Sequence, residues 1–380
     1  MERIERSAID ALLKVLQSRG FNVVAPTVRD DAIVYDEISS ASQLPAGWTD
    51  EQAPATYKLT RRDDNALFGY SVGPYSWKKF LFPPILKLLE AQRTSSGFTM
   101  QTTTHNSTEE NSVVKKYAFL GVQPCDLQAI AFQDKVFAGS MYTDPFYKSI
   151  RRDLMIIAVN CSRAGKTCFC ASMETGPKAK TGFDLALTEV VLADDSYFLV
   201  EVGSAKGGEL LKELPRRVAE PHEIEAVEQI IDRTRKSMGR HLDTLRLPEI
   251  LSENREHPRW DHVARRCLTC ANCTQVCPTC FCSTVEDVTD LAGTHADRVR
   301  KWDSCFTTEF SYIHGGSIRA TPRSRYRQWM LHKLSSWVEQ FGTSGCVGCG
   351  RCITWCPVGI DITEEARAIR EQQPHSVTSF

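Results

Sequence analysis

Eight of the fifteen cysteines occur in two copies of one spacing, and this repeat constrains the fold more than any other feature of the chain. The first copy is Cys267-x2-Cys270-x2-Cys273-x3-Cys277-Pro278, and the second is Cys346-x2-Cys349-x2-Cys352-x3-Cys356-Pro357. Three cysteines at this spacing wrap one loop around three irons of a cubane, while the fourth, followed by proline, starts a helix that leads to the other cluster. The repeat therefore predicts a ferredoxin-like domain with two [4Fe–4S] clusters.

The crossed geometry of such repeats assigns a ligand set to each cluster. One cluster is expected to use Cys267, Cys270, Cys273 and Cys356, and the other Cys346, Cys349, Cys352 and Cys277. Zinc is the competing interpretation. Structural zinc sites use two CxxC pairs, however, and not triplets with a distant fourth cysteine before a proline. The repeat therefore favours iron–sulfur clusters over zinc.

The two copies are separated by 68 residues, so the domain is expected to carry an insertion, over 283–340, which we predict to be helical. Loop closure costs little more as a loop lengthens, so the insertion can extend outwards without separating the two motifs. Three further cysteines, Cys280, Cys282 and Cys305, lie near the first motif or in the insertion. They could bind a metal, cap an accessory site or pack in the interior, and the sequence does not select among these roles.

The insertion also carries a cationic run: Arg298, Arg300, Lys301, Arg319, Arg323, Arg325 and Arg327. A solvated helix face is the simplest interpretation. Charge compensation for anionic clusters and docking of an acidic partner are the alternatives. Nucleic-acid binding is disfavoured, because the formal net charge of the whole chain is −1.

The chain before the first motif has the pattern of an α/β domain. Ile9, Leu12, Leu13 and Leu16 recur at helical spacing, with Gly20 at a position typical of a helix end. Strands are predicted at 21–24, 32–35, 117–122, 154–159, 183–192 and 197–202, a second helix through Ile224, Val227, Ile231 and Met238, and a surface loop at 91–113. The runs 117–122 and 154–159 are continuously apolar, as in strands covered on both faces. We expect an α/β domain over 1–250 and an α+β dicluster domain over 251–380.

A second group of cysteines follows the two apolar strands. Cys125 comes after the first strand, and Cys161, Cys168 and Cys170 after the second. Because neighbouring strands would bring these four thiols together, with Gly165 and Gly176 allowing close backbone approach, we predict a third metal site there. It could hold a further iron–sulfur cluster or zinc, and buried structural thiols are the remaining alternative.

Other common functions lack their motifs. The segment Ala164-Gly165-Lys166-Thr167 is not interpreted as a phosphate-binding loop, because Asn160 occupies the place of the required first glycine. No GxGxxG follows a predicted strand, and no apolar run is long enough to span a membrane. Clustered thiols and the absence of a recognisable signal peptide indicate a reducing compartment, the cytoplasm.

Several strings together resemble one family. They are Gly121-Val122-Gln123-Pro124-Cys125-Asp126-Leu127, Asn160-Cys161, Thr167-Cys168-Phe169-Cys170, Cys277-Pro278-Thr279-Cys280-Phe281-Cys282 and Cys346-Val347-Gly348-Cys349-Gly350-Arg351-Cys352. The chain is similar in these strings to the iron–sulfur β subunit of cytoplasmic group 3 [NiFe] hydrogenases, of the sulfhydrogenase or NAD(P)-linked type. The A subunit of anaerobic sulfite reductase is related. The resemblance spans most of residues 65–365.

This resemblance implies a non-catalytic electron-transfer subunit, with hydrogenase large and small subunits and a flavin- and NAD(P)-binding subunit as partners. The chain lacks the paired CxxC motifs that a nickel-binding subunit needs, and no catalytic residue is nominated. An electron-input subunit of a sulfite reductase is the alternative within the same class. A zinc-stabilised nucleic-acid-binding or scaffold protein is the alternative from a different class.

Overall fold

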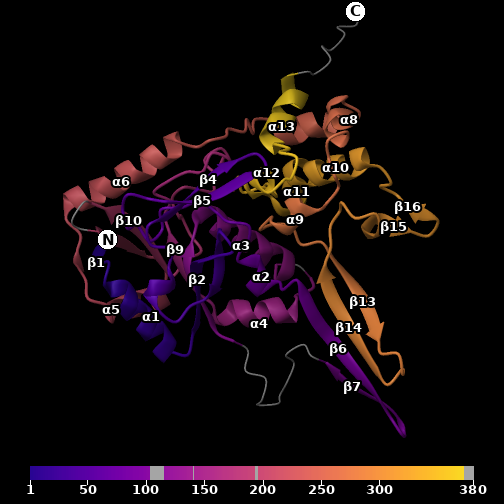
Figure 1. Cartoon of the computed structure of the whole chain (residues 1–380), viewed down its shortest axis with the longest axis horizontal. Helices are drawn as coiled ribbons and strands as arrows, with labels where there is room; N and C mark the ends of the chain where they lie inside the picture. The colour runs from indigo at the N-terminus through magenta and orange to yellow at the C-terminus, as the bar shows by residue number, and fades with distance from the viewer. Residues whose placement is uncertain (103–114, 140, 193–195, 372–380) are drawn as a thin grey trace, which may run out of the picture.

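The computed structural model describes residues 1–102, 115–139, 141–192 and 196–371. An α/β part lies beside a smaller helical part that carries the two cysteine motifs, and a narrow arm of paired strands extends from between them (Figure 1). In the described ranges, no helix is both long and apolar enough to cross a membrane.

An eight-stranded sheet forms the centre of the α/β part, in the order β12-β1-β11-β10-β9-β8-β2-β3. The pairs β2–β8, β8–β9 and β9–β10 are parallel, and the remaining pairs are antiparallel. The strands are β1 (Glu2–Glu5), β2 (Asn22–Arg29), β3 (Ala32–Glu37), β8 (Tyr117–Val122), β9 (Met155–Val159), β10 (Leu185–Val191), β11 (Ser196–Val202) and β12 (Arg217–Val218).

Helices cover both faces of this sheet, which is why its central strands are continuously apolar. On one face, α1 (Ala8–Ser18) and α5 (Ala205–Lys212) enclose a core that includes Leu120 and Ile157. On the other face, α3 (Pro124–Phe137) and α4 (Pro145–Asp153) cover Phe119 and Ile156. The long α6 (Pro221–Lys236) packs through Val227 on β10 and β11.

Most of the elements predicted for this part are confirmed. The runs 117–122 and 154–159 correspond to the parallel neighbours β8 and β9. The first predicted helix is α1, and Gly20 follows its end in the left-handed region with φ +79°. The helix predicted through Met238 is α6, but it ends at Lys236, so Met238 lies beyond it.

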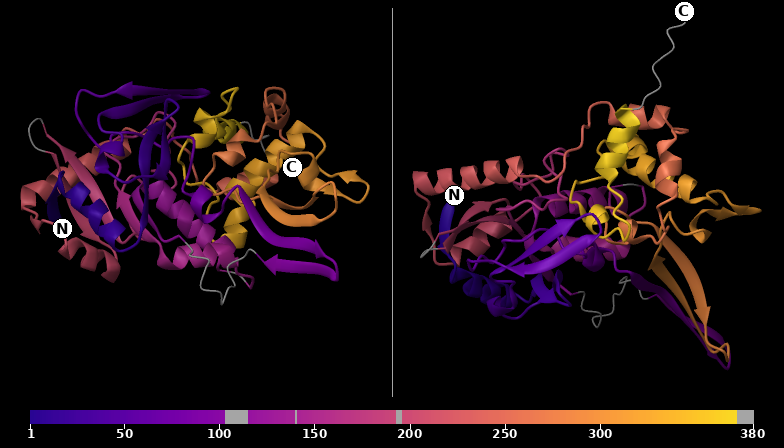
Figure 2. Two further views of the ribbon diagram at one scale, coloured as in Figure 1. Left: turned by 60° about the horizontal axis from the view of Figure 1, so that its bottom comes forward. Right: turned by 45° about the horizontal axis from the view of Figure 1, so that its top comes forward.

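The arm is a four-stranded antiparallel sheet in the order β13-β14-β6-β7, and both views of Figure 2 show it extending away from the body. Its strands are β6 (Ile85–Thr94), β7 (Gly97–Thr102), β13 (Ser283–Thr289) and β14 (His295–Trp302). The predicted loop at 91–113 is therefore wrong over 91–102, and 103–113 lies outside the described residues. Much of β6 and β7 is exposed, so the apolar alternation that marks a half-buried strand is missing.

The prediction of a helical insertion over 283–340 is wrong for its first half. Strands β13 and β14 come first, followed by η2 (Glu309–Ser311), β15 (Tyr312–Ile313) and β16 (Gly316–Ser317), and only then α10 (Pro322–Leu331), the π-helix η3 (His332–Ser336) and α11 (Trp337–Phe341). Arg298 and Lys301 lie on β14 and pair across the strands with Asp287 and Glu286. The sequence predicts a solvated helix face for these two cations, but they pair with carboxylates across two antiparallel strands.

A separate apolar core supports the cysteine motifs. Trp260 and Leu251, which precede the first motif, are buried there against Trp329 and Met330 of the insertion. The remaining elements of this part are α7 (Leu247–Glu253), α8 (Arg259–Ala264), α9 (Asn272–Gln275), α12 (Arg351–Thr354) and α13 (Ile362–Glu371). The α/β part adds η1 (Ala41–Gln43), the hairpin of β4 (Trp48–Ala53) and β5 (Thr56–Arg61), and α2 (Lys78–Leu81).

Candidate metal centres

The two cysteine motifs fold into loops with the same backbone pattern. Thr269 and Ala271 have φ of +51° and +66°, and the residues at the same positions of the second motif, Gly348 and Gly350, have φ of +65° and +78°. In both loops a backbone amide two residues after the first cysteine donates to its sulfur: Thr269 N–H to Cys267 Sγ and Gly348 N–H to Cys346 Sγ, each at 3.4 Å. Such N–H···S bonds are typical of thiolates that bind iron–sulfur clusters.

Packing explains why only the second motif uses glycine at these positions. A Cβ atom on Gly348 would lie 2.7 Å from the backbone of Cys170, and one on Gly350 would lie 2.4 Å from the carbonyl oxygen of Thr167. The second loop therefore packs backbone to backbone on the segment that carries Cys168 and Cys170. The first loop faces outwards, since Cys270 and Leu268 are exposed, and there side chains fit.

We call Cys267, Cys270, Cys273 and Cys356 the first thiol group. The four line one cavity with Tyr326, Trp329 and Cys352, while Cys277 does not line it. Two buried donors in its wall, Tyr326 Oη and Trp329 Nε1, have no hydrogen-bond partner among the described residues. Sulfide and thiolate sulfurs accept hydrogen bonds, so this donor set fits a [4Fe–4S] cluster. The backbone N–H of Ile360 also donates to a sulfur of this group, Cys356 Sγ, at 3.3 Å.

We call Cys346, Cys349, Cys352 and Cys277 the second thiol group. Each of the first three interacts electrostatically with Cys277, which comes from the other motif. Cys352 also interacts with Cys273, so the first and second groups are neighbours. Burial raises the pKa of the Cys346 thiol to about 12. As thiolate ligands, these residues would need compensating positive charge, which bound iron would supply.

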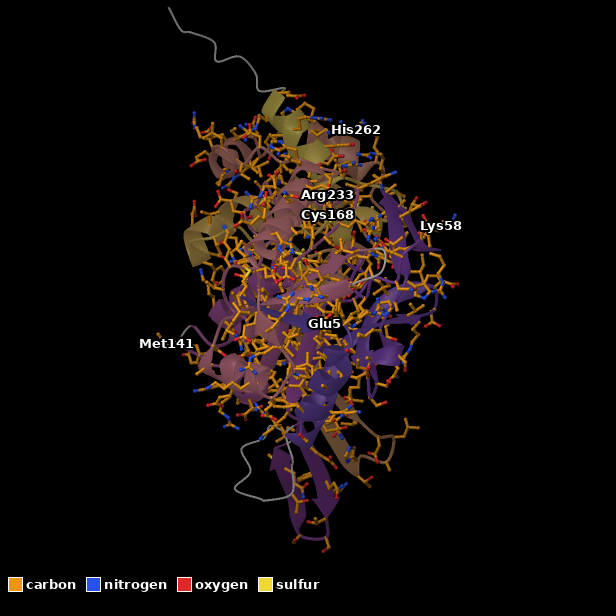
Figure 3. All side chains as sticks on the ribbon, turned by 90° about the vertical axis from the view of Figure 1, so that its left-hand side faces the viewer. Glu5, Lys58, Met141, Cys168, Arg233 and His262 are labelled. Carbon is orange, nitrogen blue, oxygen red and sulfur yellow. The ribbon has the colours of Figure 1, made fainter. Side chains whose placement is uncertain are left out.

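The third thiol group consists of Cys125, Cys161, Cys168 and Cys170, which α3 and the segment after β9 bring together. Cys170 interacts with Cys168 and Cys161, and Cys125 with Cys170, while Cys125 and Cys170 share a buried cluster with Cys349. Cys168 is buried, and Figure 3 labels it in the upper half of the view, below Arg233. Burial raises the pKa of all four thiols, to about 12 for Cys168.

The predicted role of two glycines in the third group agrees with the contacts. A Cβ atom on Gly165 would lie 3.3 Å from Cys168 Sγ, and one on Gly176 would lie 2.9 Å from Cys170 Sγ. Among the described residues, no three His, Cys, Asp or Glu side chains are close enough together to hold a single metal ion.

The accessory thiols Cys280, Cys282 and Cys305 do not form a further group of their own. Cys280 is hydrogen-bonded to Cys277, and Cys282 to Cys305. The Cys305 thiol lowers the pKa of Cys282 to about 7. The contacts thus attach one accessory thiol to the second thiol group and leave the other two as a pair.

Sequence reasoning missed three buried charged contacts at the site. Arg351, between Cys349 and Cys352, makes two hydrogen bonds to Asp126, which follows Cys125, at 2.8 and 2.9 Å. Both side chains are almost completely buried. Lys333 and Lys78 are buried beside Cys277 and Cys280. Asp126 and Arg351 adjoin ligand candidates, which is a usable signal, but nothing in the sequence singles out the two lysines.

Comparison with known proteins agrees with the cysteine pattern. Residues 266–360 match the 4Fe-4S dicluster domain family. Sulfhydrogenase 2 subunit beta of Pyrococcus furiosus is 33% identical over 260 residues, which cover 67% of this chain and 75% of that protein. No solved structure shows significant similarity.

Proposed function

The chain belongs to the family of sulfhydrogenase beta subunits, and from this premise we propose that it connects the hydrogen-oxidising subunits of a hydrogenase with a flavin- and NAD(P)-binding subunit. It is an iron–sulfur electron-transfer subunit of an oxidoreductase complex, and we nominate no catalytic residue in it. The relative is named as a sulfhydrogenase subunit, which favours this function over the related sulfite reductases.

The row of thiol groups is the observation that carries the proposal. The third group shares a buried cluster with Cys349 of the second, and Cys352 of the second interacts with Cys273 of the first. The first group reaches the surface at Cys270. When bound, [4Fe–4S] clusters supply one-electron redox steps. The polypeptide places the second group next to each of the other two, and backbone amides donate to the sulfurs of Cys267, Cys346 and Cys356.

We assign the ligands as the sequence predicts: the first thiol group to one cluster, the second to another, and the third to a further [4Fe–4S] cluster, with zinc as its alternative. The accessory thiols receive no ligand role. We propose a cytoplasmic location, because a reducing compartment would keep the fifteen free cysteines reduced.

Paired serine substitutions test the crossed assignment. Cys277→Ser with Cys346→Ser should remove about four irons, because both residues bind one cluster, whereas Cys277→Ser with Cys267→Ser should remove about eight. Iron content and EPR of the purified complex are the measurements. Crossed assignment fails if the first pair removes eight irons and the second removes four. A colourless, zinc-containing wild-type complex would instead refute the electron-transfer function.

The need for the proposed partner subunits can be tested with the isolated chain. We expect it to show no H2- or NAD(P)H-dependent activity alone and to co-purify with the other subunits. A stable monomer with either activity would refute this part of the proposal.

A further inference from the structure

Lys333 is a buried cation in an unusual stretch of backbone. It lies in the π-helix η3 between α10 and α11, and only 3% of it is exposed. π-Helical turns inside helices are uncommon and occur frequently at functional sites, because the wider turn redirects a side chain. Here the wider turn is also held by the segment before the second motif, since Gly345 N–H donates to the Lys333 carbonyl oxygen at 2.8 Å.

The ammonium group of Lys333 has three acceptors for its three donors. Nζ lies 3.2 Å from Cys277 Sγ, 3.1 Å from Thr279 Oγ1 and 3.1 Å from the Gly345 carbonyl oxygen. Thr279 Oγ1 in turn lies 3.2 Å from the same sulfur. Within the described ranges, this is the one cationic side chain that donates directly to a sulfur of the three thiol groups.

The charge of Lys333 is not balanced by a carboxylate. No ion pair joins it to Asp or Glu in the part of the chain that the structure describes, and its electrostatic partners are Cys277, Cys280 and Cys346. Arg351 is different, because Asp126 neutralises it through two hydrogen bonds. A buried ammonium without an anion is very unfavourable, so the second thiol group is the anion that Lys333 requires.

A second buried lysine lies on the same side. Lys78 Nζ contacts the carbonyl oxygens of Cys280 at 3.1 Å and Gln275 at 3.4 Å, and lies 3.9 Å from the centre of the Trp302 ring. It too forms no ion pair with a carboxylate of the described residues, and its electrostatic partners include Cys277, Cys280 and Cys282. The surroundings of Cys277 are therefore cationic, although the chain as a whole is nearly neutral.

We propose that Lys333 is a positioning residue that raises the reduction potential of the cluster bound by the second thiol group above those of its neighbours. Reduction adds negative charge, which a buried ammonium and its N–H···S bond stabilise. An added electron would then reside preferentially in the middle of the row. This inference rests on the proposed function and on the assignment of Cys277 to the second group.

The test is a redox titration of the intact complex, followed by EPR, in wild type, Lys333→Met, Lys333→Arg and the control Lys236→Met. Lys236 is also a lysine, but its side chain is exposed to solvent and pairs with Asp232. The signal of the second cluster is identified by its loss in Cys346→Ser. In Lys333→Met we expect the reduced-to-oxidised ratio of that cluster to fall at least tenfold at the wild-type midpoint, which corresponds to 59 mV for one electron.

The remaining outcomes separate charge from structure. Recovery of most of the shift in Lys333→Arg, with no shift in Lys236→Met, supports the proposal. If Lys333→Met loses the second cluster and Lys333→Arg retains it, that result also supports the proposal. Unchanged potentials in Lys333→Met, or loss of about four irons in both Lys333 variants, would overturn it. If the wild-type complex itself lacks clusters, the proposed function fails and not only this inference.

Discussion

At the scale of single residues, the ion pair of Arg351 with Asp126 connects the two polypeptide segments that carry the second and third thiol groups. Each charged side chain lies next to a ligand candidate, and Tyr35 Oη donates to Asp126 at 3.2 Å. Arg351 Nε also donates to the Gly73 carbonyl oxygen at 3.1 Å. The pair therefore determines how the Cys349–Cys352 loop lies on the start of α3.

Removing one charge of this pair should be costly. Asp126→Asn leaves the Arg351 charge buried without its partner, and such a change destabilises a protein by about 3–5 kcal/mol. The control Asp287→Asn breaks the exposed pair with Arg298 and should cost less than about 1 kcal/mol. Denaturant unfolding of both variants, followed by iron release and by fluorescence, measures the difference. Equal midpoints would contradict a structural role for the buried pair.

The sequence nominates ligand candidates but does not indicate the residues that support them. The spacing of the candidates is local, because three cysteines of each motif lie on one loop, so Cys267 and Cys346 could be nominated without a fold. Lys333 and Cys277 are 56 residues apart, and their contact depends on a π-helix that no pattern in the sequence indicates. The buried state of Lys78 likewise follows from the position of Trp302 on β14.

At the scale of elements, the two cysteine loops share a backbone and differ in what covers them. Ala271 and Gly350 occupy the same position, both with positive φ, yet only Gly350 packs against Thr167. The sequence shows the glycines but not this contact, because it joins segments more than 180 residues apart.

This difference predicts the effect of Gly350→Ala. Its Cβ would lie 2.4 Å from the carbonyl oxygen of Thr167, which is part of the backbone and cannot rotate away, and the left-handed conformation adds about 1–2 kcal/mol. We expect iron to be lost from the second and third thiol groups while the EPR signal of the first group remains. The matched control Ala271→Gly should keep its full iron content. Loss confined to the first group would show that the loops are packed differently.

The arm shows the limit of prediction at this scale. Strands β8 and β9 are recognisable because helices cover both their faces and keep them apolar. Strand β6 has solvent on much of its surface and is held by pairing with β14, which lies about 200 residues later in the chain. Local composition therefore predicts a loop for the last four residues of β6 and a helix for β14, and only the tertiary pairing makes both segments strands.

At the scale of the whole molecule, the three thiol groups run from the interior to the surface. The third group lies at the ends of β8 and β9, with most of its side chains buried, and the first group ends at the exposed Cys270. The second group lies between them, in contact with both. Such a row needs a redox-active centre at its inner end if electrons are to travel its full length.

Substituting an inner ligand tests this arrangement. Cys168→Ser should lower the iron content by about four atoms, because a [4Fe–4S] cluster lost from the third group leaves the two ferredoxin-like clusters with their own ligands. Their EPR signals should persist, whereas H2-dependent reduction of the electron acceptor should fall if the third group is part of the path.

Cys305→Ser is the matched control, since Cys305 is paired with Cys282 and belongs to none of the three groups. The iron content of this variant should equal that of wild type. An unchanged iron content in Cys168→Ser with loss of one zinc per chain would assign zinc to the third group. An unchanged content of both metals would leave its four cysteines as buried structural thiols and shorten the row to two clusters.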